Sequence, residues 1–419
     1  MRLEAAESKR RFRHISVAGI FFQGGAAAVD TSTVVAALVH GLTGSAFAVG
    51  AAAGIARFGW LFPQLFVAYY AQRRARRLPF YMAGAFGRVA CLAALAALLW
   101  LAVSPAGASV VVPFFVLWTV YAFVSGIVAV PYNDIVARSI PSDRRSRMLA
   151  LRFFGGGLLA LAVAAAAYRI LEALPFPSGH AALVLLGAIL LLISAVSFVS
   201  AGEPQAPVEH SAAAGFVNFL RGSFDIFVGD RRFRLFLIAQ WLGGTAAMAL
   251  PFYILQTQSS APDVAFLLGA QTAGALFSNP VWGWWGDRRG KRELLEITAA
   301  LGALAPLLTL AWIAGDTGRG ALALPYFAVV FALLGAVGNG STIAYLGYLM
   351  EISPDDRRPA YSGYFNALAA PAGLLPMAGG AVAEAASFAA VFAVSVAAAA
   401  LQFLIVRRLR AIPIGDRER

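Results

Sequence analysis

Charge and cysteine are both scarce in this sequence. Only 13% of the 419 residues are charged, whereas soluble domains carry about 25%. The single cysteine, Cys91, cannot form an internal disulfide, and no pattern of Cys and His indicates a metal site. Walker, HExxH and GxSxG motifs are absent too, which argues against direct use of ATP and against an intramembrane enzyme. We therefore expect no enzymatic activity, no cofactor and no metal.

Apolar residues make up most of the chain. Hydrophobic residues account for 60% of it, and the mean hydropathy is +0.74. A water-soluble fold could not bury so much apolar surface, so the composition predicts an integral membrane protein. The formal net charge of +12 would suggest nucleic acid as the partner of a soluble protein. Here the basic residues lie in short loops between apolar runs, where we expect them to face lipid head groups instead.

Apolar runs long enough to cross a bilayer, which takes about 20 residues, recur along the chain. Because lipid offers no partners to backbone N–H and C=O groups, each run is expected to be helical. The first run has no clear cleavage site and is too long for a signal peptide, so it is interpreted as a span. The twelve predicted spans are 15–40, 45–71, 79–102, 109–138, 147–170, 180–201, 233–257, 262–286, 293–314, 322–350, 358–384 and 387–406.

The distribution of Lys and Arg predicts the orientation. The N-terminus, the loops after even-numbered spans with the span ends beside them, and the C-terminus hold 28 of these 33 residues. By the positive-inside rule both termini are expected in the cytoplasm, with the protein in a bacterial inner membrane.

The longest inner connection divides the chain. It begins with EPQAPVEH and continues as GFVNFLRGSFDIFVGDRRFR, whose apolar residues recur at near-helical spacing. This pattern predicts an amphipathic helix on the membrane surface. The expected organisation is a six-helix bundle over 1–201, a linker over 202–232, a second six-helix bundle over 233–410 and a tail over 411–419.

The two halves repeat each other. AYYAQRRARR at 68–77 matches GWWGDRRGKR at 283–292, and SIPSDRR at 139–145 matches ISPDDRR at 352–358. A weaker similarity links GGAAAV at 24–29 to GGTAAM at 243–248. Repeated loops at matching places in two sets of six spans indicate a duplicated unit.

With these features the sequence resembles the major facilitator superfamily, although no subfamily is indicated. The resemblance implies an all-α membrane protein with 12 transmembrane helices in two six-helix bundles related by an internal repeat. The family signature G-x-x-x-D-R-x-G-[RK]-[RK] is complete at Gly283, Asp287, Arg288, Gly290, Lys291 and Arg292, and Glu351 with Arg358 resembles the family's E-x6-R. The first half departs from the pattern, with Gln72 where an Asp is expected and Arg138 where a Glu is.

In the resembled family the signature loop joins the two halves when the transporter faces outward. Asp287 is expected to accept hydrogen bonds at the start of span 5, near Arg145, because a carboxylate suits a helix N-terminus. Glu351 and Asp356 are the expected partners of Arg288 or Arg292. The mirror site around Gln72 should form a weaker gate, to which Arg73, Arg76, Arg77 and Asp134 also belong. The alternative is that these charges only obey the positive-inside rule.

Four ionisable residues lie deep in predicted spans, and all are in the first half. Charge at that depth is costly and usually marks function. Asp30 begins the run DTST in span 1, and Arg57 lies at a similar depth in span 2, so an ion pair between them is expected. The pair could let Asp30 carry a proton across the membrane, or it could only hold two helices together.

The other two deep residues are arginines for which the sequence leaves more than one partner open. Arg88 is on span 3, which lies away from the cavity in the resembled family, so a structural role is favoured. Arg152 could contact an anionic group of a solute or pair with Asp134. Asp134, one turn before Arg138, could instead pair with Arg88 or with the loop at 73–77.

Spans 1, 4, 7 and 10 line the cavity in the resembled family. Amides and tyrosines on them can hydrogen-bond a solute, although Tyr132 and Tyr345 also suit an interfacial aromatic belt. Together with Arg57 and Arg152, the candidate substrate and coupling residues are Gln23, Asp30, Tyr132, Asn133, Gln240, Tyr253, Asn339 and Tyr345.

The sequence thus predicts a secondary-active, proton-coupled transporter that moves a small organic solute by alternating access, with export favoured by the resemblance. Its partners would be the solute, protons and membrane lipids, and the protein is expected to be a monomer. The alternative is a non-transporting receptor or membrane assembly factor that retains the transporter fold, to which the altered gate of the first half gives weight.

Overall fold

The structure is a computed structural model that describes residues 2–71, 74, 76–102, 107–204, 227–257, 260–315, 322–353 and 358–411. Within these ranges every regular element is a helix. Most of the predicted amphipathic linker lies outside the described residues, as do Gln72, Arg73 and Asp356. The side chains of Arg145 and Arg358 are also outside the description.

The first half contains seven helices for six predicted spans. They are α1 (Arg2–Ala28), α2 (Val34–Thr43), α3 (Ala46–Ala71), α4 (Leu78–Trp100), α5 (Ala108–Ser139), α6 (Ser142–Ala173) and α7 (Ser178–Ala201).

The second half matches the other six spans, with short 3-10 segments inserted. Its elements are α9 (Arg231–Ala246), η1 (Ala247–Phe252), η2 (Ile254–Gln256), α10 (Ala261–Arg288), α11 (Lys291–Gly302), α12 (Leu304–Ala314), α13 (Ala323–Ile352), α14 (Arg358–Ala369), η3 (Ala370–Leu374), α15 (Leu375–Ala385), α16 (Phe388–Arg408) and η4 (Leu409–Ala411). In the described chain, eleven helical segments are long and apolar enough to cross a membrane. The twelfth span is divided between α1 and the ten-residue α2.

Several spans are interrupted rather than continuous. Span 1 loses its α-helical form between Ala28 and Val34, and span 7 turns into 3-10 helix after Ala246. Both interruptions fall in or directly after the matched sequences GGAAAV and GGTAAM. Pro251 in η1 and Pro371 in η3 lack a backbone N–H, which explains part of the irregularity in spans 7 and 11.

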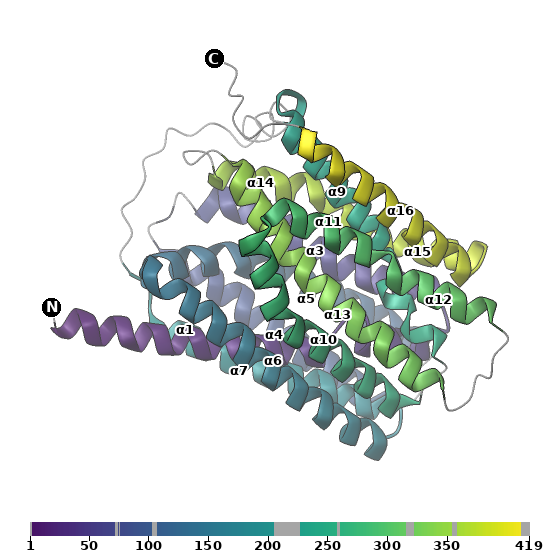
Figure 1. The fold of residues 1–419 in the computed structure, drawn as a ribbon. Coiled ribbons are helices and arrows are strands. Elements are labelled where there is room, and N and C mark those ends of the chain that lie inside the picture. The colour runs from purple at the N-terminus through teal and green to yellow at the C-terminus, as the bar shows by residue number, and fades with distance from the viewer. Residues whose placement is uncertain are drawn as a thin grey trace.

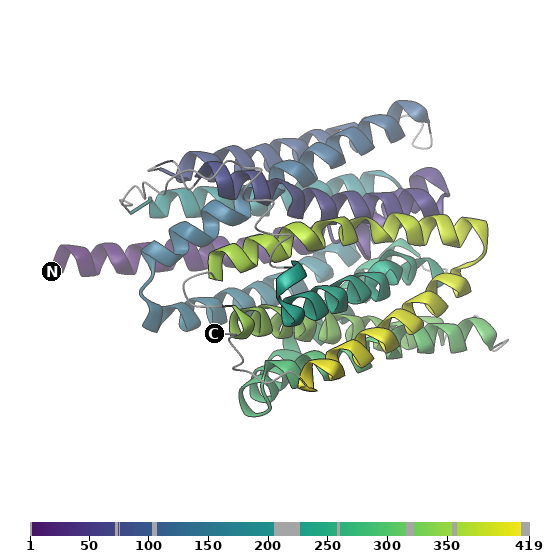
Figure 2. The same ribbon diagram turned by 90° about the horizontal axis from the view of Figure 1, so that it is seen from above.

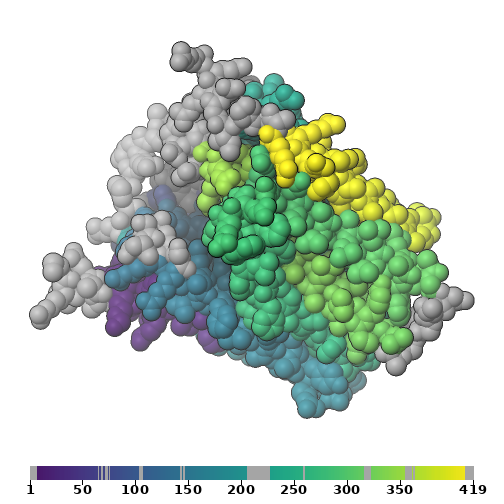
Figure 3. All heavy atoms as spheres, viewed as in Figure 1, coloured from purple at the N-terminus to yellow at the C-terminus, as the bar shows by residue number. Residues whose placement is uncertain are grey.

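The two halves form two bundles of helices that lie side by side. Figures 1 and 2 show the helices running roughly along one direction, with α1 beginning at the same end of the molecule at which α16 finishes. We call this end the terminal end, and the opposite end the far end. The space-filling view shows the second half, in green and yellow, resting against the blue and purple first half (Figure 3). The contacts between halves are made chiefly by α3 with α15 and by α6 with α10.

At the far end the halves are tightly joined. The side chain of Glu384 in α15 accepts hydrogen bonds from the Ser45 hydroxyl at 2.5 Å and from the Phe47 backbone N–H at 3.0 Å. Glycines let the backbones of α3 and α15 approach each other, because a Cβ at Gly50 would overlap the carbonyl oxygen of Pro376. Small residues and one carboxylate therefore close this end.

Candidate functional site

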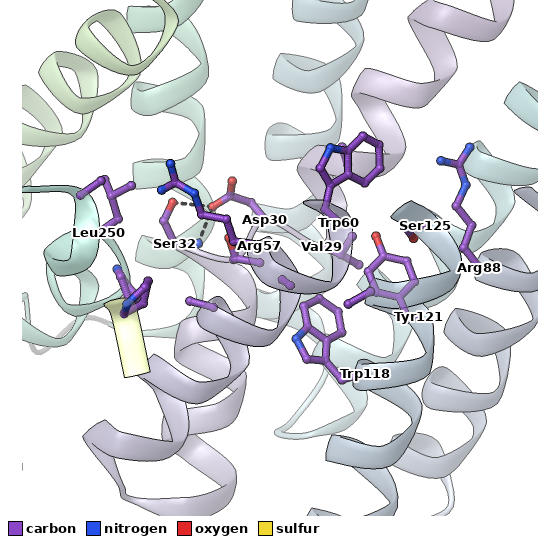
Figure 4. Close-up of a pocket in the computed structure, with 18 of the residues that line it drawn as sticks. Val29, Asp30, Ser32, Arg57, Trp60, Arg88, Trp118, Tyr121, Ser125 and Leu250 are labelled. Carbon is purple, nitrogen blue, oxygen red and sulfur yellow. Dashed lines mark hydrogen bonds between the residues drawn. The ribbon is translucent and has the colours of Figure 1, made fainter. Parts of the chain in front are cut away.

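Three neighbouring cavities lie between the helices, on the terminal side of the far-end contact. The central one, of about 470 Å³, is lined by both halves (Figure 4). A second, of about 390 Å³, shares Asp30 and Gln271 with it, and a third, of about 220 Å³, shares Phe22, Trp60 and Arg88. Volumes of this size suit small organic ligands. We refer to the first as the central cavity and to the others as the second and third cavities.

Asp30 lies on the wall of the central cavity at the break between α1 and α2. Its Oδ1 accepts four hydrogen bonds, from the backbone N–H and the hydroxyl of Ser32 and from the same two groups of Thr33, at 2.7–3.0 Å. Figure 4 shows Asp30 beside Ser32. Asp30 therefore stabilises the turn of residues 30–33 that leads into α2, as an Asp side chain commonly does with the backbone N–H groups that follow it. Ser32 also exchanges hydrogen bonds with Gln271 of α10, at 3.1–3.2 Å, so this turn touches the second half.

The expected ion pair between Asp30 and Arg57 is not formed. Both residues line the central cavity, but within the described chain Arg57 has no ion pair and Asp30 is bound by its own turn. The sequence argument expected the two residues near each other, and both do line one cavity, but the backbone N–H groups and hydroxyls of Ser32 and Thr33 bind the carboxylate without a second helix.

Arg88 has a different position from the one predicted. It is 1% exposed and lines both the central and the third cavity, although span 3 was expected to lie away from the cavity. Its guanidinium lies over the Phe22 ring, 5.1 Å from the centroid, and its Nε has no hydrogen-bond partner in the described residues. Asp134, one possible partner for Arg88, is bound by Arg77 and Arg138 instead.

Arg152 lies in the third cavity together with Tyr132 and Asn133. It donates to the Tyr132 hydroxyl at 3.2 Å and lies 5.7 Å from the centroid of the Phe22 ring. Asp134, its other expected partner, is instead bound by Arg77 and Arg138. Of the alternatives left open for Asp134, pairing with the loop at 73–77 is the one the structure shows.

Aromatic residues on the cavity wall were missed by the sequence analysis. Trp60, Trp118 and Tyr121 line the central cavity, and Figure 4 shows their rings between Arg57 on one side and Arg88 on the other. Trp118 donates its Nε1–H to the Ala52 carbonyl at 2.8 Å, which fixes its ring. In a chain with 12% aromatic residues, no local signal distinguishes these rings from those that face lipid.

The polar candidates divide between the cavities and the helix packing. Gln23 and Asn339 line the second cavity, where Asn339 donates to Asn279 at 2.7 Å. Tyr345 instead joins three helices, donating to the Ala239 carbonyl at 3.0 Å and accepting from Gln402 at 2.7 Å. The two remaining candidates, Gln240 and Tyr253, line none of the three cavities, and Tyr253 is 2% exposed.

The signature loop of the second half is folded but does not reach the first half. Asp287 is 80% exposed and pairs with Lys291 at 3.2 Å on its own loop, rather than with the start of α6. Gly290 has a φ of +88°, a conformation that favours glycine, which explains this position of the signature. Arg288 lies over the Trp284 ring at 5.3 Å. The expected contact is absent because the halves meet at the far end and not here.

The expected partner of Arg288 or Arg292 is present in the same half. Glu351, at the end of α13, accepts from the Lys291 backbone N–H and lies within electrostatic reach of Arg292. Glu351 therefore holds the turn that follows α10.

The first half builds the same support from different residues. Arg138 stands where the second half has Glu351, and the carboxylate is supplied instead by Glu203, just after α7. Glu203 accepts from the backbone N–H groups of Arg77 and Leu78 at 2.9–3.0 Å and from the Arg138 guanidinium at 2.7 Å. Arg138 in turn bonds Asp134. The departure of the first half from the signature thus coincides with a rearranged charge network.

This network perturbs the titration of Glu203. Burial alone would raise its pKa, but the hydrogen bonds from Arg138 and from the Arg77 and Leu78 backbone outweigh burial, and the pKa is lowered. The carboxylate is therefore held in its charged form.

Comparison with known proteins agrees with this architecture. The sequence model of the Major Facilitator Superfamily matches residues 233–419, the second half of the chain. No curated protein sequence matches the chain.

Solved structures match it over nearly its whole length. The nucleoside transporter NupG (D323A mutant) has a TM-score of 0.70 at 12% identity and covers 96% of this chain and 99% of its own. A POT family transporter in complex with 5-aminolevulinic acid scores 0.72 at 10% identity, covering 96% and 95%. A bacterial homologue of the iron transporter ferroportin, in an outward-facing state, scores 0.64 at 13% identity, covering 96% and 100%.

Helices that can cross a membrane and a cavity between two halves define an integral membrane protein with a transporter fold. The fold is shared over nearly the whole chain with solved transporter structures, and the second half also matches the sequence model of the Major Facilitator Superfamily. Identities of 10–13% show the fold and leave the solute unassigned.

Proposed function

We propose that the protein is a secondary-active transporter that moves a small organic solute by alternating access. The observation that supports this most directly is the central cavity, whose walls come from both halves, including Arg57 from the first and Gln271 and Leu250 from the second. A ligand held there would contact both halves, so its binding would respond to any change in how the halves are placed.

The moving parts would be the bundles 1–201 and 233–410. The far-end contact between Glu384 and Ser45 would break when the cavity opens to that side, and the signature loop around Asp287 would then contact the first half. Because Lys and Arg concentrate at the terminal end, we place that end in the cytoplasm of a bacterial cell, with the protein in the inner membrane. One chain supplies all the cavity walls, so the proposed working unit is a monomer.

Protons would supply the driving force, and Asp30 would carry them. It is the only carboxylate on the walls of the three described cavities. Its Oδ1 is bound by the turn, whereas its Oδ2 has no hydrogen bond in the described residues. Export is the proposed direction, and family resemblance is its support.

Reconstituted vesicles test this function. The purified protein, placed in vesicles with a pH-sensitive dye inside, should move protons when a transported solute is added on one side, and accumulate solute when a proton gradient is imposed. Empty vesicles provide the control. Ligand binding without movement of either solute or protons would instead support the alternative, a receptor or assembly factor that retains the fold.

A further inference from the structure

The charge on the cavity walls is unbalanced. Three arginines, Arg57, Arg88 and Arg152, line the three cavities, and Asp30 is the only acidic residue on the same walls. Asp30 already accepts four hydrogen bonds from its own turn. No described carboxylate forms an ion pair with any of these arginines. The hollow is therefore positively charged in the absence of a ligand.

Of the three arginines, Arg88 gives the strongest indication of a bound anion. A guanidinium that is 1% exposed, with an Nε that lacks a partner among the described residues, is costly in a helical membrane protein. The Nε of Arg152 is also unpartnered in the described chain, and both side chains lie over the same Phe22 ring, at 5.1 and 5.7 Å. An anion bound beside this ring would be attracted by both positive charges.

The rest of the wall suits an apolar body. Trp60, Trp118 and Tyr121 present rings between Arg57 and Arg88 (Figure 4), and alanines fill much of the remaining surface. Aromatic rings gain from stacking against a planar ligand. A bare inorganic anion would fill little of a cavity of about 470 Å³ and leave these rings without contacts.

We propose that the central cavity binds a small organic anion, with a carboxylate or similar acidic group at Arg88 and an aromatic or other planar apolar body that lies against Trp60 and Trp118 and extends toward Arg57. This inference rests on the proposed function in treating the cavity as the solute site. It adds the chemical class of the solute. Arg152 would attract the same charge from the third cavity, on the terminal side.

The charge of the cavity can be measured without knowing the solute. The chain has one cysteine, so Cys91→Ser gives a cysteine-free background. Ala26→Cys then places a thiol on the wall shared by the central and second cavities. The measurement compares the rates of modification by a methanethiosulfonate that carries a sulfonate and by one that carries a trimethylammonium group. A free thiol in solution gives the reference ratio of the two rates.

The ratio should favour the sulfonate reagent by about tenfold over the reference, because uncompensated guanidinium groups raise the local concentration of anions. Arg57→Gln and Arg88→Gln should each lower the ratio toward the reference. Arg169→Gln removes an exposed arginine outside the cavities and should leave it unchanged. A ratio at or below the reference in the arginine-containing protein overturns the inference, and this reading does not depend on whether the Arg88 variant folds.

Protection experiments test the apolar part. A panel of aromatic acids with the matching amides, such as phenylacetate and phenylacetamide, is added with inorganic phosphate as a third arm. The thiol of Ala26→Cys is then modified with the neutral reagent methyl methanethiosulfonate. We expect the aromatic acids to slow this modification, and the amides and phosphate to leave its rate unchanged. Equal protection by amides, stronger protection by phosphate, or no protection by any acid at millimolar concentration contradicts the proposed ligand class.

The outcomes separate this inference from the proposed function. The ratio of modification rates reflects the local concentration of anions in the cavity and needs no transport. Anion selectivity without solute or proton movement in vesicles would support the anion site and contradict the proposed transport function. Movement of a neutral or cationic solute in vesicles, without anion selectivity, would support the proposed transport function and contradict the anion site.

Discussion

Asp30 shows how one side chain can serve a local and a global purpose. Its Oδ1 holds the start of α2 through Ser32 and Thr33, while the side chain also lines the central cavity. The hydrogen bonds of the turn need only an acceptor oxygen, whereas carrying a proton needs a group that ionises. The two purposes can therefore be separated by substitution.

Asp30→Asn should keep the hydrogen bonds of the turn and lose the charge, whereas Asp30→Ala should lose both. We expect the Ala variant to lower the free energy of unfolding by about 1 kcal/mol, the usual net value of a hydrogen bond, and the Asn variant to stay near the parent. If Asp30 carries the proton, Asn should retain solute exchange but abolish solute-driven proton movement. Thermal unfolding and vesicle assays check both parts. Unchanged proton movement in the Asn variant would remove the coupling role.

Glu203 is the residue for which pH dependence can be predicted. Because its pKa is lowered in the folded protein, its charged form contributes stability above the ordinary Glu pKa of 4.5, and that stability is lost as the pH falls through the lowered pKa. Glu203→Gln should therefore lower the melting temperature at pH 7, and the difference from the parent should shrink below about pH 4. Glu172→Gln, in an exposed pair with Arg169, is the matched control. A difference that persists unchanged at low pH would contradict the assignment.

At the scale of elements, the irregular helices surround the cavity. The break after α1 brings Asp30 and Ser32 to its wall, and the 3-10 segment η1 brings Leu250 and Pro251 to the same wall. Backbone that departs from the α-helix is tolerated at membrane depth when it lines a cavity or is covered by protein. The matching positions in the two halves are consistent with a duplicated span that kept its break and diverged in its side chains.

The close contact of α3 with α15 yields a prediction about closure. Gly50→Val should disfavour the closed far end, because the added Cβ meets the Pro376 carbonyl and the α3 and α15 backbones cannot yield cheaply. In a Cys91→Ser background, cysteines at Ser45 and Glu384 should be joined by a short bifunctional reagent, and Gly50→Val should slow that reaction several-fold. Gly302→Val is the control, since a Cβ there meets nothing within 4 Å. An unaffected reaction rate would show that this contact does not hold the far end closed.

For the whole molecule, alternating access requires the two ends to respond in opposite directions. Asp287 is exposed and the far end is joined, so the described conformation has its contact between halves at the far end. Cysteines at Asp287 and Arg147, on α10 and α6, should be cross-linked slowly in the parent and faster in the Gly50→Val variant. The same substitution should lower cross-linking between Ser45 and Glu384. Both ends changing in the same direction would fit general loosening and would contradict alternation.

Much of the architecture followed from local patterns. Apolar run length placed the second to twelfth spans close to the described helices, because a bilayer forces every crossing segment to satisfy its own backbone hydrogen bonds. The first span, expected over 15–40, instead begins at Arg2 and is interrupted between Ala28 and Val34. The repeated loops also indicated two related halves, because an internal repeat can be detected by comparing the sequence with itself.

The contacts of charged and aromatic residues could not be predicted from local patterns. Asp30 and Arg57 share a depth and a cavity, but the nearer donors of the DTST turn bind the carboxylate. Glu203 replaces a carboxylate missing from another loop, and nothing in its neighbourhood along the chain indicates that role.

The order of residues was sufficient for what depends on near neighbours: which segments are helical, that they lie in a membrane, and that one half copies the other. The three-dimensional packing was needed for what depends on residues far apart: Arg88 on a cavity wall, Trp60 and Trp118 facing it, and the far end closed by Glu384. The physical reason is that solvation by lipid acts on each segment separately, whereas pairing of charges and rings depends on which helices come to lie together.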